Sequence, residues 1–299
     1  MRVAVTGSTG FLGSAISRHL VALGDDVLAI DHHGSECPLD LADHTSLPRL
    51  ALALEGCAEV YHLAGVLGTS ELDTLPFYAI DNNITATVTV LEAARRAGLE
   101  RFFLPAKPNV WNNVYTISRR AAQDFGLLHA HNGWLDVRLL CYFNLFGPGQ
   151  RLLPVRKMVP TFIAHALTGH PLPVYGSGEQ TVDLVHVDDA ARLTVQFLRG
   201  PRPEPGSIPE VGRGLALTVT EVADTINRLC HTRAGIRHLP MRQGETKETN
   251  LSANGKSFAM YEFGSLVDQL DSTIQWYRDN FSREALEEVV ALMVSHDRS

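Results

Sequence analysis

Lysine, paired cysteine and long apolar runs are all scarce in this sequence of 299 residues. The four cysteines, Cys37, Cys57, Cys141 and Cys230, are scattered without C-x-x-C spacing, which indicates neither a disulfide framework nor a zinc site, so we expect no metal. No apolar run reaches the roughly eighteen residues of a membrane span. The first strand pattern starts at the initiator methionine, which leaves no room for a signal peptide. These absences predict a cytoplasmic protein.

Charge is the second scarcity, because the chain has no block of basic residues and its formal net charge is −7. This argues against nucleic acid and against a membrane as partners, and favours a small-molecule substrate. Only four lysines stand against 22 arginines, so the place of each lysine is informative. A hydrophobic content of 45% allows a large core, and the length predicts one main domain with a smaller companion.

The N-terminus carries a glycine fingerprint, TGSTGFLG at residues 6–13, between a strand-like run and an apolar helical pattern. Gly7 permits the tight turn, Gly10 lets the backbone approach a pyrophosphate, and Gly13 allows close helix packing. Free N–H groups at the helix N-terminus then face the anion. A second strand, 27–30, is followed by Asp31, which is placed to accept a hydrogen bond from a ribose hydroxyl. Together these features predict a dinucleotide site.

Strand and helix patterns alternate through the first half, which predicts an α/β fold with a doubly wound parallel sheet. Ligands of such sheets bind at the carboxyl ends of the strands. The strands expected are 59–64, 101–104 and 136–141, with a helix over 83–97 and carboxyl ends near 62–67, 105–111 and 142–149.

After residue 150 the elements shorten, with a helix expected over 159–167, extended segments at 171–175 and 181–187, and helices near 218–231, 264–280 and 282–295. We therefore predict a dinucleotide-binding domain, 1–150 with 183–212 returning to it. A smaller C-terminal substrate lobe is predicted from 151–182 and 213–299.

The motifs resemble those of the extended short-chain dehydrogenase/reductases, and within them the nucleotide-sugar epimerases and dehydratases. The matching segments are TGSTGFLG, LDLAD at 39–43, YHLAG at 61–65, the stretch 83–102, FNLFGPGQ at 143–150 and the stretch 159–189. The resemblance implies a Rossmann fold, with Asp40 and Leu41 beside the adenine. The cofactor-binding residues that we predict are Gly7, Gly10, Phe11, Leu12, Gly13, Asp31, His32, His33, Asp40, Leu41, Leu63, Ala64, Gly65, Asn83 and Pro105.

The family's catalytic pattern is altered here. Its chemistry uses a Ser or Thr near the substrate oxygen and a Tyr-x-x-x-Lys pair, but this chain places Lys107 at the hydroxyl position and reads Tyr115-x-x-x-Arg119. Lysine has no acceptor, and arginine is a planar cation rather than a point ammonium. The family also has a substrate-covering excursion of about twenty residues before the tyrosine. Here only three residues separate Trp111 from Tyr115, and a segment of this length spans at most about 14 Å between the two Cα atoms.

The sugar-nucleotide site is also reduced. Val182 stands where the resemblance implies a diphosphate-binding arginine, whereas Arg242 matches a second family arginine. We predict Trp111, Asn144 and Arg242 as substrate-binding residues.

These departures favour an oxidoreductase of changed substrate: an NAD(P)H-dependent ketoreductase that transfers hydride to a ketone of a non-nucleotide, aromatic polyketide in antibiotic biosynthesis. The altered triad is similar to that of atypical polyketide-tailoring ketoreductases, which implies an angucyclinone carbonyl. Tyr115 supported by Arg119, Lys107, or a substrate phenol could provide the proton. The alternatives are a nucleotide-sugar epimerase or dehydratase, and a non-catalytic dinucleotide sensor.

Cofactor choice stays open between NAD and NADP. Asp31 favours NAD because a carboxylate repels the 2′-phosphate of NADP, but His32 and His33 could turn toward that phosphate. Alanine-rich helical surfaces at 83–97 and 116–131 make a homodimer possible, although core packing explains the same pattern.

Overall fold

The computed structural model describes residues 1–108, 112–241, 250–251, 257–258 and 260–296. Its chain folds as two compact units. Unit 1 comprises Met1–Tyr142 and Asp188–Val211, and unit 2 comprises Phe143–Val187 and Gly212–Ser299. The boundaries fall at 143 and 188, where the sequence predicts 151 and 183. The assignment of cofactor and substrate to separate lobes stays a prediction.

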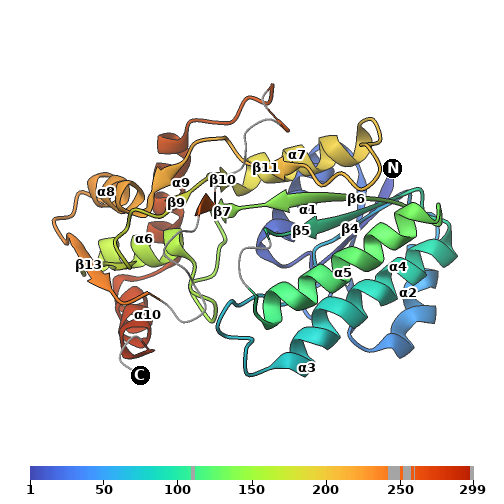
Figure 1. The fold of residues 1–299 in the computed structure, drawn as a ribbon, viewed down its shortest axis with the longest axis horizontal. Coiled ribbons are helices and arrows are strands. Elements are labelled where there is room, and N and C mark those ends of the chain that lie inside the picture. The colour runs from blue at the N-terminus through green and yellow to red at the C-terminus, as the bar shows by residue number, and fades with distance from the viewer. Residues whose placement is uncertain (109–111, 242–249, 252–256, 259, 297–299) are drawn as a thin grey trace. The chain divides into compact units, whose positions relative to one another are not determined.

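Unit 1 is built on a seven-stranded sheet in the order β11-β6-β5-β4-β1-β2-β3. All of its pairings are parallel, which confirms the predicted doubly wound α/β sheet (Figure 1). Its interior strands are apolar because helices cover both faces. The strands are β1 (Arg2–Thr6), β2 (Asp26–Asp31), β3 (Cys37–Pro38), β4 (Glu59–His62), β5 (Arg101–Ala106), β6 (Asp136–Tyr142) and β11 (Glu210–Val211).

The helices of unit 1 are α1 (Phe11–Ala22), α2 (Leu47–Leu54), α3 (Pro76–Ala79), α4 (Ala86–Ala97), α5 (Val114–His131) and α7 (Val187–Arg199, whose first residue belongs to unit 2), with a short 3₁₀ turn, η1 (His44–Ser46). Helices α2, α4 and α5 lie side by side (Figure 1). The helix expected over 83–97 is different in detail: its start is a π-helical segment, η2 (Ile80–Thr85), and regular α-helix begins only at Ala86.

An ion-pair network closes the edge of unit 1 opposite the strand carboxyl ends. Glu59 is fully buried, and its carboxylate accepts from Arg101 Nε at 2.9 Å, Arg199 Nε at 3.0 Å and the Tyr61 hydroxyl at 3.0 Å. Arg199 also donates to Asp25 at 2.8 Å. A buried carboxylate persists only when it is paired in this way, so α7 is tied to β4 and to the loop before β2.

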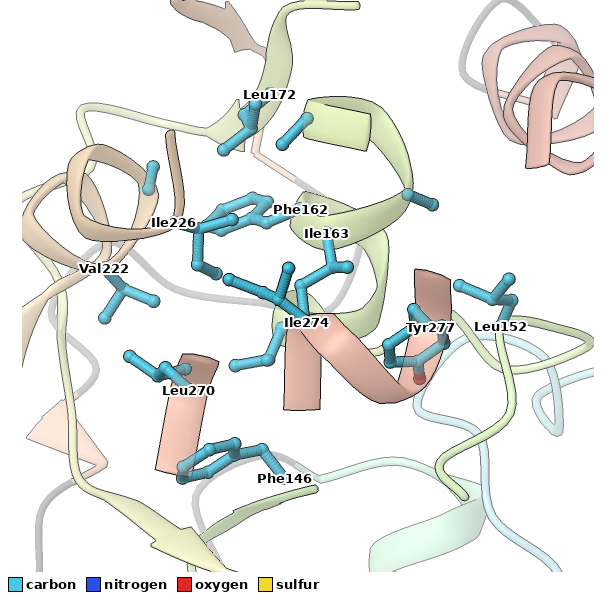
Figure 2. Packing of buried hydrophobic residues seen from close by; sticks show 14 of the residues in the cluster. Phe146, Leu152, Phe162, Ile163, Leu172, Val222, Ile226, Leu270, Ile274 and Tyr277 are labelled. Atoms are coloured by element: carbon cyan, nitrogen blue, oxygen red, sulfur yellow. The ribbon is translucent and has the colours of Figure 1, made fainter. Parts of the chain in front are cut away.

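The described residues of unit 2 form short strands and four helices. The strands are β7 (Asn144–Phe146), β8 (Leu172–Tyr175), β9 (Thr181–Val182), β10 (Leu184–His186), β12 (Leu217–Thr218), β13 (Ile236–Leu239) and β14 (Asn250–Leu251); the helices are α6 (Met158–Thr168), α8 (Val219–Leu229), α9 (Leu266–Asn280) and α10 (Arg283–His296). Figure 2 shows its core, where Phe162 of α6, Ile226 of α8 and Ile274 of α9 point toward one another.

The single strand expected over 181–187 is interrupted at Asp183. Its fully buried carboxylate accepts from the backbone N–H of Arg213 at 3.0 Å and of Gly214 at 2.8 Å. The strand breaks because this side chain turns inward to cap main-chain donors of the returning segment. Among the residues that the structure describes, no helix is long and apolar enough to cross a membrane.

Candidate active site

The glycine loop of unit 1 is closed by backbone-to-backbone packing. Gly7 has φ +68°, and a Cβ there would lie 2.6 Å from Ala64 N. A Cβ on Gly13 would lie 2.0 Å from the Gly7 carbonyl oxygen. Gly7 and Gly13 therefore have no room for a side chain, and α1 begins after the short loop that follows β1, where its first-turn N–H groups are available to an anion.

Asp31 lies at the end of β2, beside this loop. Its Oδ2 accepts from the backbone N–H of Thr9 at 3.0 Å and from the Thr9 hydroxyl at 2.6 Å, and its Oδ1 accepts from the N–H of His32 at 2.8 Å. A carboxylate has about four acceptor sites, so capacity for a ribose hydroxyl remains. Loop and carboxylate together fit the adenosine half of a dinucleotide.

The other residues predicted to lie on the adenosine side differ in how exposed they are. His32 and His33 are exposed, with ring centroids 6.0 Å apart. Asp40 is exposed and accepts from the N–H of Ala42 at 2.9 Å, whereas the Leu41 side chain is buried. Phe11 and Leu12 are half-buried in the first turn of α1.

A directed hydrogen-bond chain crosses the floor of the site through His62, which is fully buried. Thr87 Oγ1 donates to the Asn83 carbonyl at 2.7 Å, so toward His62 Nε2, 3.0 Å away, it can only accept. His62 is thus protonated on Nε2, and its Nδ1 accepts from Thr6 Oγ1 at 2.7 Å. Burial, reinforced by the charge of Arg119, lowers the pKa of His62 to about 3, which keeps the ring neutral.

Asn83 is fully buried within the π-helical segment η2 and joins two parts of the site. Its Oδ1 accepts from the N–H of Val66 at 2.9 Å, next to Gly65. Its Nδ2 donates to Ser118 Oγ at 3.0 Å on α5. A π turn re-aims one side chain out of helical register and is frequent at functional sites. Here it fixes the loop after β4 against the helix that carries Tyr115 and Arg119.

Tyr115 and Arg119 lie on α5, one turn apart. Arg119 Nη2 donates to the Pro105 carbonyl at 2.8 Å, and its Nη1 would be 3.0 Å from a Cβ on Gly65. Leu63 and Ala64 are half-buried on the same loop. Burial raises the pKa of the Tyr115 phenol, while the charge of Arg119 acts in the opposite direction. Tyr115, Arg119, Pro105, Gly65 and Asn83 are therefore brought together at the carboxyl ends of β4 and β5.

Lys107 joins this group from the segment after β5. Its Nζ donates to Thr116 Oγ1 at 2.7 Å and lies 5.2 Å from the centroid of the Tyr115 ring. The side chain is thus held in the site by neighbours on the first turn of α5. The three predicted catalytic residues are close together in unit 1.

The predicted substrate residues are less completely placed. Asn144 lies in unit 2 on β7, and its Nδ2 is buried with no hydrogen-bond partner among the residues described. Val182 is buried in the core of unit 2. Trp111 and Arg242 lie outside the described residues.

A family model now decides the classification, because it matches residues 3–106 and 104–212. The chain belongs to the NAD dependent epimerase/dehydratase family. UDP-glucuronic acid decarboxylase 1 of Arabidopsis thaliana is 28% identical over 80% of this chain, which spans 61% of the plant protein. The solved dTDP-glucose 4,6-dehydratase of Streptomyces venezuelae, with NAD bound, has a TM-score of 0.82, 25% identity and coverage of 94% and 98%. UDP-glucose 4-epimerase from Thermotoga maritima has a TM-score of 0.85 over 94% of this chain and 100% of that one, at 20% identity, and shows the fold alone.

These comparisons correct the function predicted from the altered triad. The expected ketoreductase of an aromatic polyketide is wrong, because curated relatives of this chain are decarboxylases, epimerases and dehydratases of nucleotide sugars. Lys107, Arg119 and Val182 are therefore not signs of a change away from nucleotide sugars. The resemblance to the epimerase/dehydratase family and the nicotinamide dinucleotide cofactor are confirmed at the level of the family, for which NAD is the named cofactor.

Sequence reasoning missed the residues that hold the site together. His62, Thr87 and Ser118 carry the hydrogen bonds described above, and Thr116 holds Lys107. The only signals for them were polar residues inside apolar strand and helix patterns.

Proposed function

We propose that this chain is an NAD-dependent enzyme that exchanges hydride with a carbon of the sugar in a nucleotide sugar, as an epimerase, dehydratase or decarboxylase does. The observation that carries the proposal is the cluster of Tyr115, Arg119, Asn83 and Gly65 at the carboxyl ends of β4 and β5. In a doubly wound sheet this is the edge where ligands bind. The family and its sugar-nucleotide members support the choice of substrate class.

NAD is proposed over NADP because of Asp31. Its carboxylate is fixed by Thr9 beside the glycine loop, where a second anion on the ribose would be repelled. Bound NAD would supply the hydride acceptor. Around it we propose Gly7, Gly10 and Gly13 at the pyrophosphate, Asp31 at the adenosine ribose, and Arg119 with Asn83 at the nicotinamide side.

Tyr115 is proposed to take the proton of the sugar hydroxyl while hydride leaves the same carbon, so that the alcohol becomes a ketone. Asn144, with its unpartnered amide, is proposed as a substrate contact in unit 2. The cytoplasmic location expected from the sequence stays a prediction, as does a homodimer. Exposed Ile117 and Leu128, three turns apart on α5, support the homodimer.

Calorimetric titration of the NAD-loaded protein with UDP-glucuronate, UDP-glucose and dTDP-glucose, followed by chromatography of products, tests the proposal. We expect saturable binding of at least one sugar nucleotide and its NAD-dependent conversion. Tyr115→Phe should keep the binding and lose the conversion. Failure of all three ligands to bind would refute the proposed substrate class.

One observation favours a second candidate, a dinucleotide sensor: both a lysine at the hydroxyl position and an arginine at the lysine position surround Tyr115. A sensor would bind NAD and sugar nucleotide without turnover. The same titration and product analysis separate the two functions.

A further inference from the structure

Lys107 is attached to the helical turn that carries Tyr115. Its Nζ donates to Thr116 Oγ1 at 2.7 Å, and Thr116 is buried. The same Nζ is 5.2 Å from the centroid of the Tyr115 ring, within the range of a cation–π contact. The ammonium therefore comes from the end of β5 and is held over a residue of α5.

Arg119 is engaged differently. One nitrogen of its guanidinium donates to the Pro105 carbonyl at 2.8 Å, and the other terminal nitrogen lies so close to Gly65 that a Cβ there would be 3.0 Å from it. A planar fork held by one main-chain hydrogen bond and packed beside Gly65 provides a fixed charge rather than a mobile ammonium. It still acts electrostatically on Tyr115.

We infer that Lys107 supplies the ammonium that stabilises the Tyr115 phenolate. Lys107, after β5, and Arg119, on α5, together take the place of the single lysine of a Tyr-x-x-x-Lys pair. The inference rests on the proposed function, because it takes Tyr115 as the proton acceptor. In the oxidative step the phenolate oxygen would take the proton of the sugar hydroxyl and become a neutral phenol. The C–H bond of the same carbon would break as the alcohol becomes a ketone, and bound NAD would supply the acceptor for that hydride. Lys107 acts through Tyr115 and is a positioning residue.

Other charged groups near this pair come from several elements. Asp73 accepts from the N–H of Val114 at 3.3 Å at the start of α5. Cys141 of β6 lies within reach of the charges of Lys107 and of Glu210 on β11. Burial raises the pKa of the Cys141 thiol to about 12, so this thiol stays neutral where a stabilised phenol would titrate.

The test is the pKa of Tyr115, measured by tyrosinate difference absorbance. The titration curve of the Tyr115→Phe variant is subtracted from that of the wild type, and the curve of the Lys107→Ala/Tyr115→Phe double variant is subtracted from that of Lys107→Ala. Each difference removes the absorbance of the other six tyrosines. The Lys107 ammonium lies 5.2 Å from the ring centroid, so its loss should raise the Tyr115 pKa by about one unit. Lys107→Arg should restore most of the difference. Arg120→Ala, which removes an exposed cation from the same helix, should change nothing.

An unchanged Tyr115 pKa in folded Lys107→Ala overturns the inference. If that variant does not fold, Thr116→Val provides the test, since it keeps every charge and removes the hydrogen bond that holds the ammonium. A smaller upward shift of the Tyr115 pKa in this variant supports the inference, and the absence of a shift overturns it. The titration contains no substrate, so its failure leaves the proposed function standing. Where a nucleotide sugar is converted, the oxidation rate should rise at a higher pH in Lys107→Ala than in the wild type, and the difference in pH should equal the shift in the Tyr115 pKa.

Discussion

The buried His62 ring should make the protein sensitive to mild acid. In the unfolded chain this imidazole takes up a proton near pH 6.5, whereas burial lowers its folded-state pKa to about 3. Between these values the unfolded state binds the extra proton, so stability is complete above pH 6.5 and is lost as the pH falls toward 3. From the two pKa values the loss is about 2 kcal/mol at pH 5, relative to pH 8.

The perturbation that isolates this effect is His62→Asn. The amide oxygen can still accept from Thr6, but the shorter side chain no longer reaches Thr87, so the variant should be less stable by about 1 kcal/mol at pH 8. It cannot take up a proton. The stability gap between wild type and variant should therefore narrow as the pH falls, reverse near pH 6, and leave the variant more stable by about 1 kcal/mol at pH 5.

Urea unfolding at pH 8, 7, 6 and 5, followed by circular dichroism, measures both curves. Groups other than His62 titrate in both proteins, so their contributions cancel in the difference. His131→Asn at an exposed position controls for the loss of one imidazole. Parallel stability curves for wild type and His62→Asn would refute the assignment of a neutral, buried ring at this position.

Three further predictions concern the loop, the ion network and the assembly. Gly13→Ala should abolish measurable NAD binding in calorimetry, because its Cβ would lie 2.0 Å from a main-chain oxygen and the loop would have to open; retained binding would contradict the packing described. Arg199→Met should cost about 3 kcal/mol in urea unfolding, since it leaves the buried carboxylate of Glu59 with one arginine fewer, whereas Arg95→Met in an exposed pair should cost clearly less. Ile117→Asn should convert a homodimer to monomer in sedimentation velocity, and a dimer that persists would place the interface elsewhere.

Periodicity and glycine spacing were sufficient to predict the sheet, because both are local consequences of backbone geometry. The parallel order, the helix at the glycine loop and the place of Asp31 all follow from alternating elements. The π-helical start at Ile80–Thr85 could not be predicted, since it depends on His62 and Asn83 making hydrogen bonds to residues distant in sequence.

The substrate prediction failed for a related reason. Identities at Lys107 and Val182 were compared with a family pattern one position at a time, but a motif position does not give the geometry around it. The structure shows that Lys107 is held by Thr116 on another element, a relationship that no spacing rule contains. The altered residues around Tyr115 bear more directly on the proposed proton transfer than on which molecule is bound.

The composition of unit 1 from two separated segments has a consequence for synthesis on the ribosome. Arg199, which pairs with Glu59 and Asp25, and β11, which completes the sheet beside β6, are translated only after the first stretch of unit 2. A nascent chain that has emerged as far as residue 142 therefore has a buried carboxylate lacking one of its arginine partners and an unpaired edge at β6. Unit 1 therefore cannot complete its fold until residue 211 has emerged, and a truncation after β6 would lack both α7 and β11.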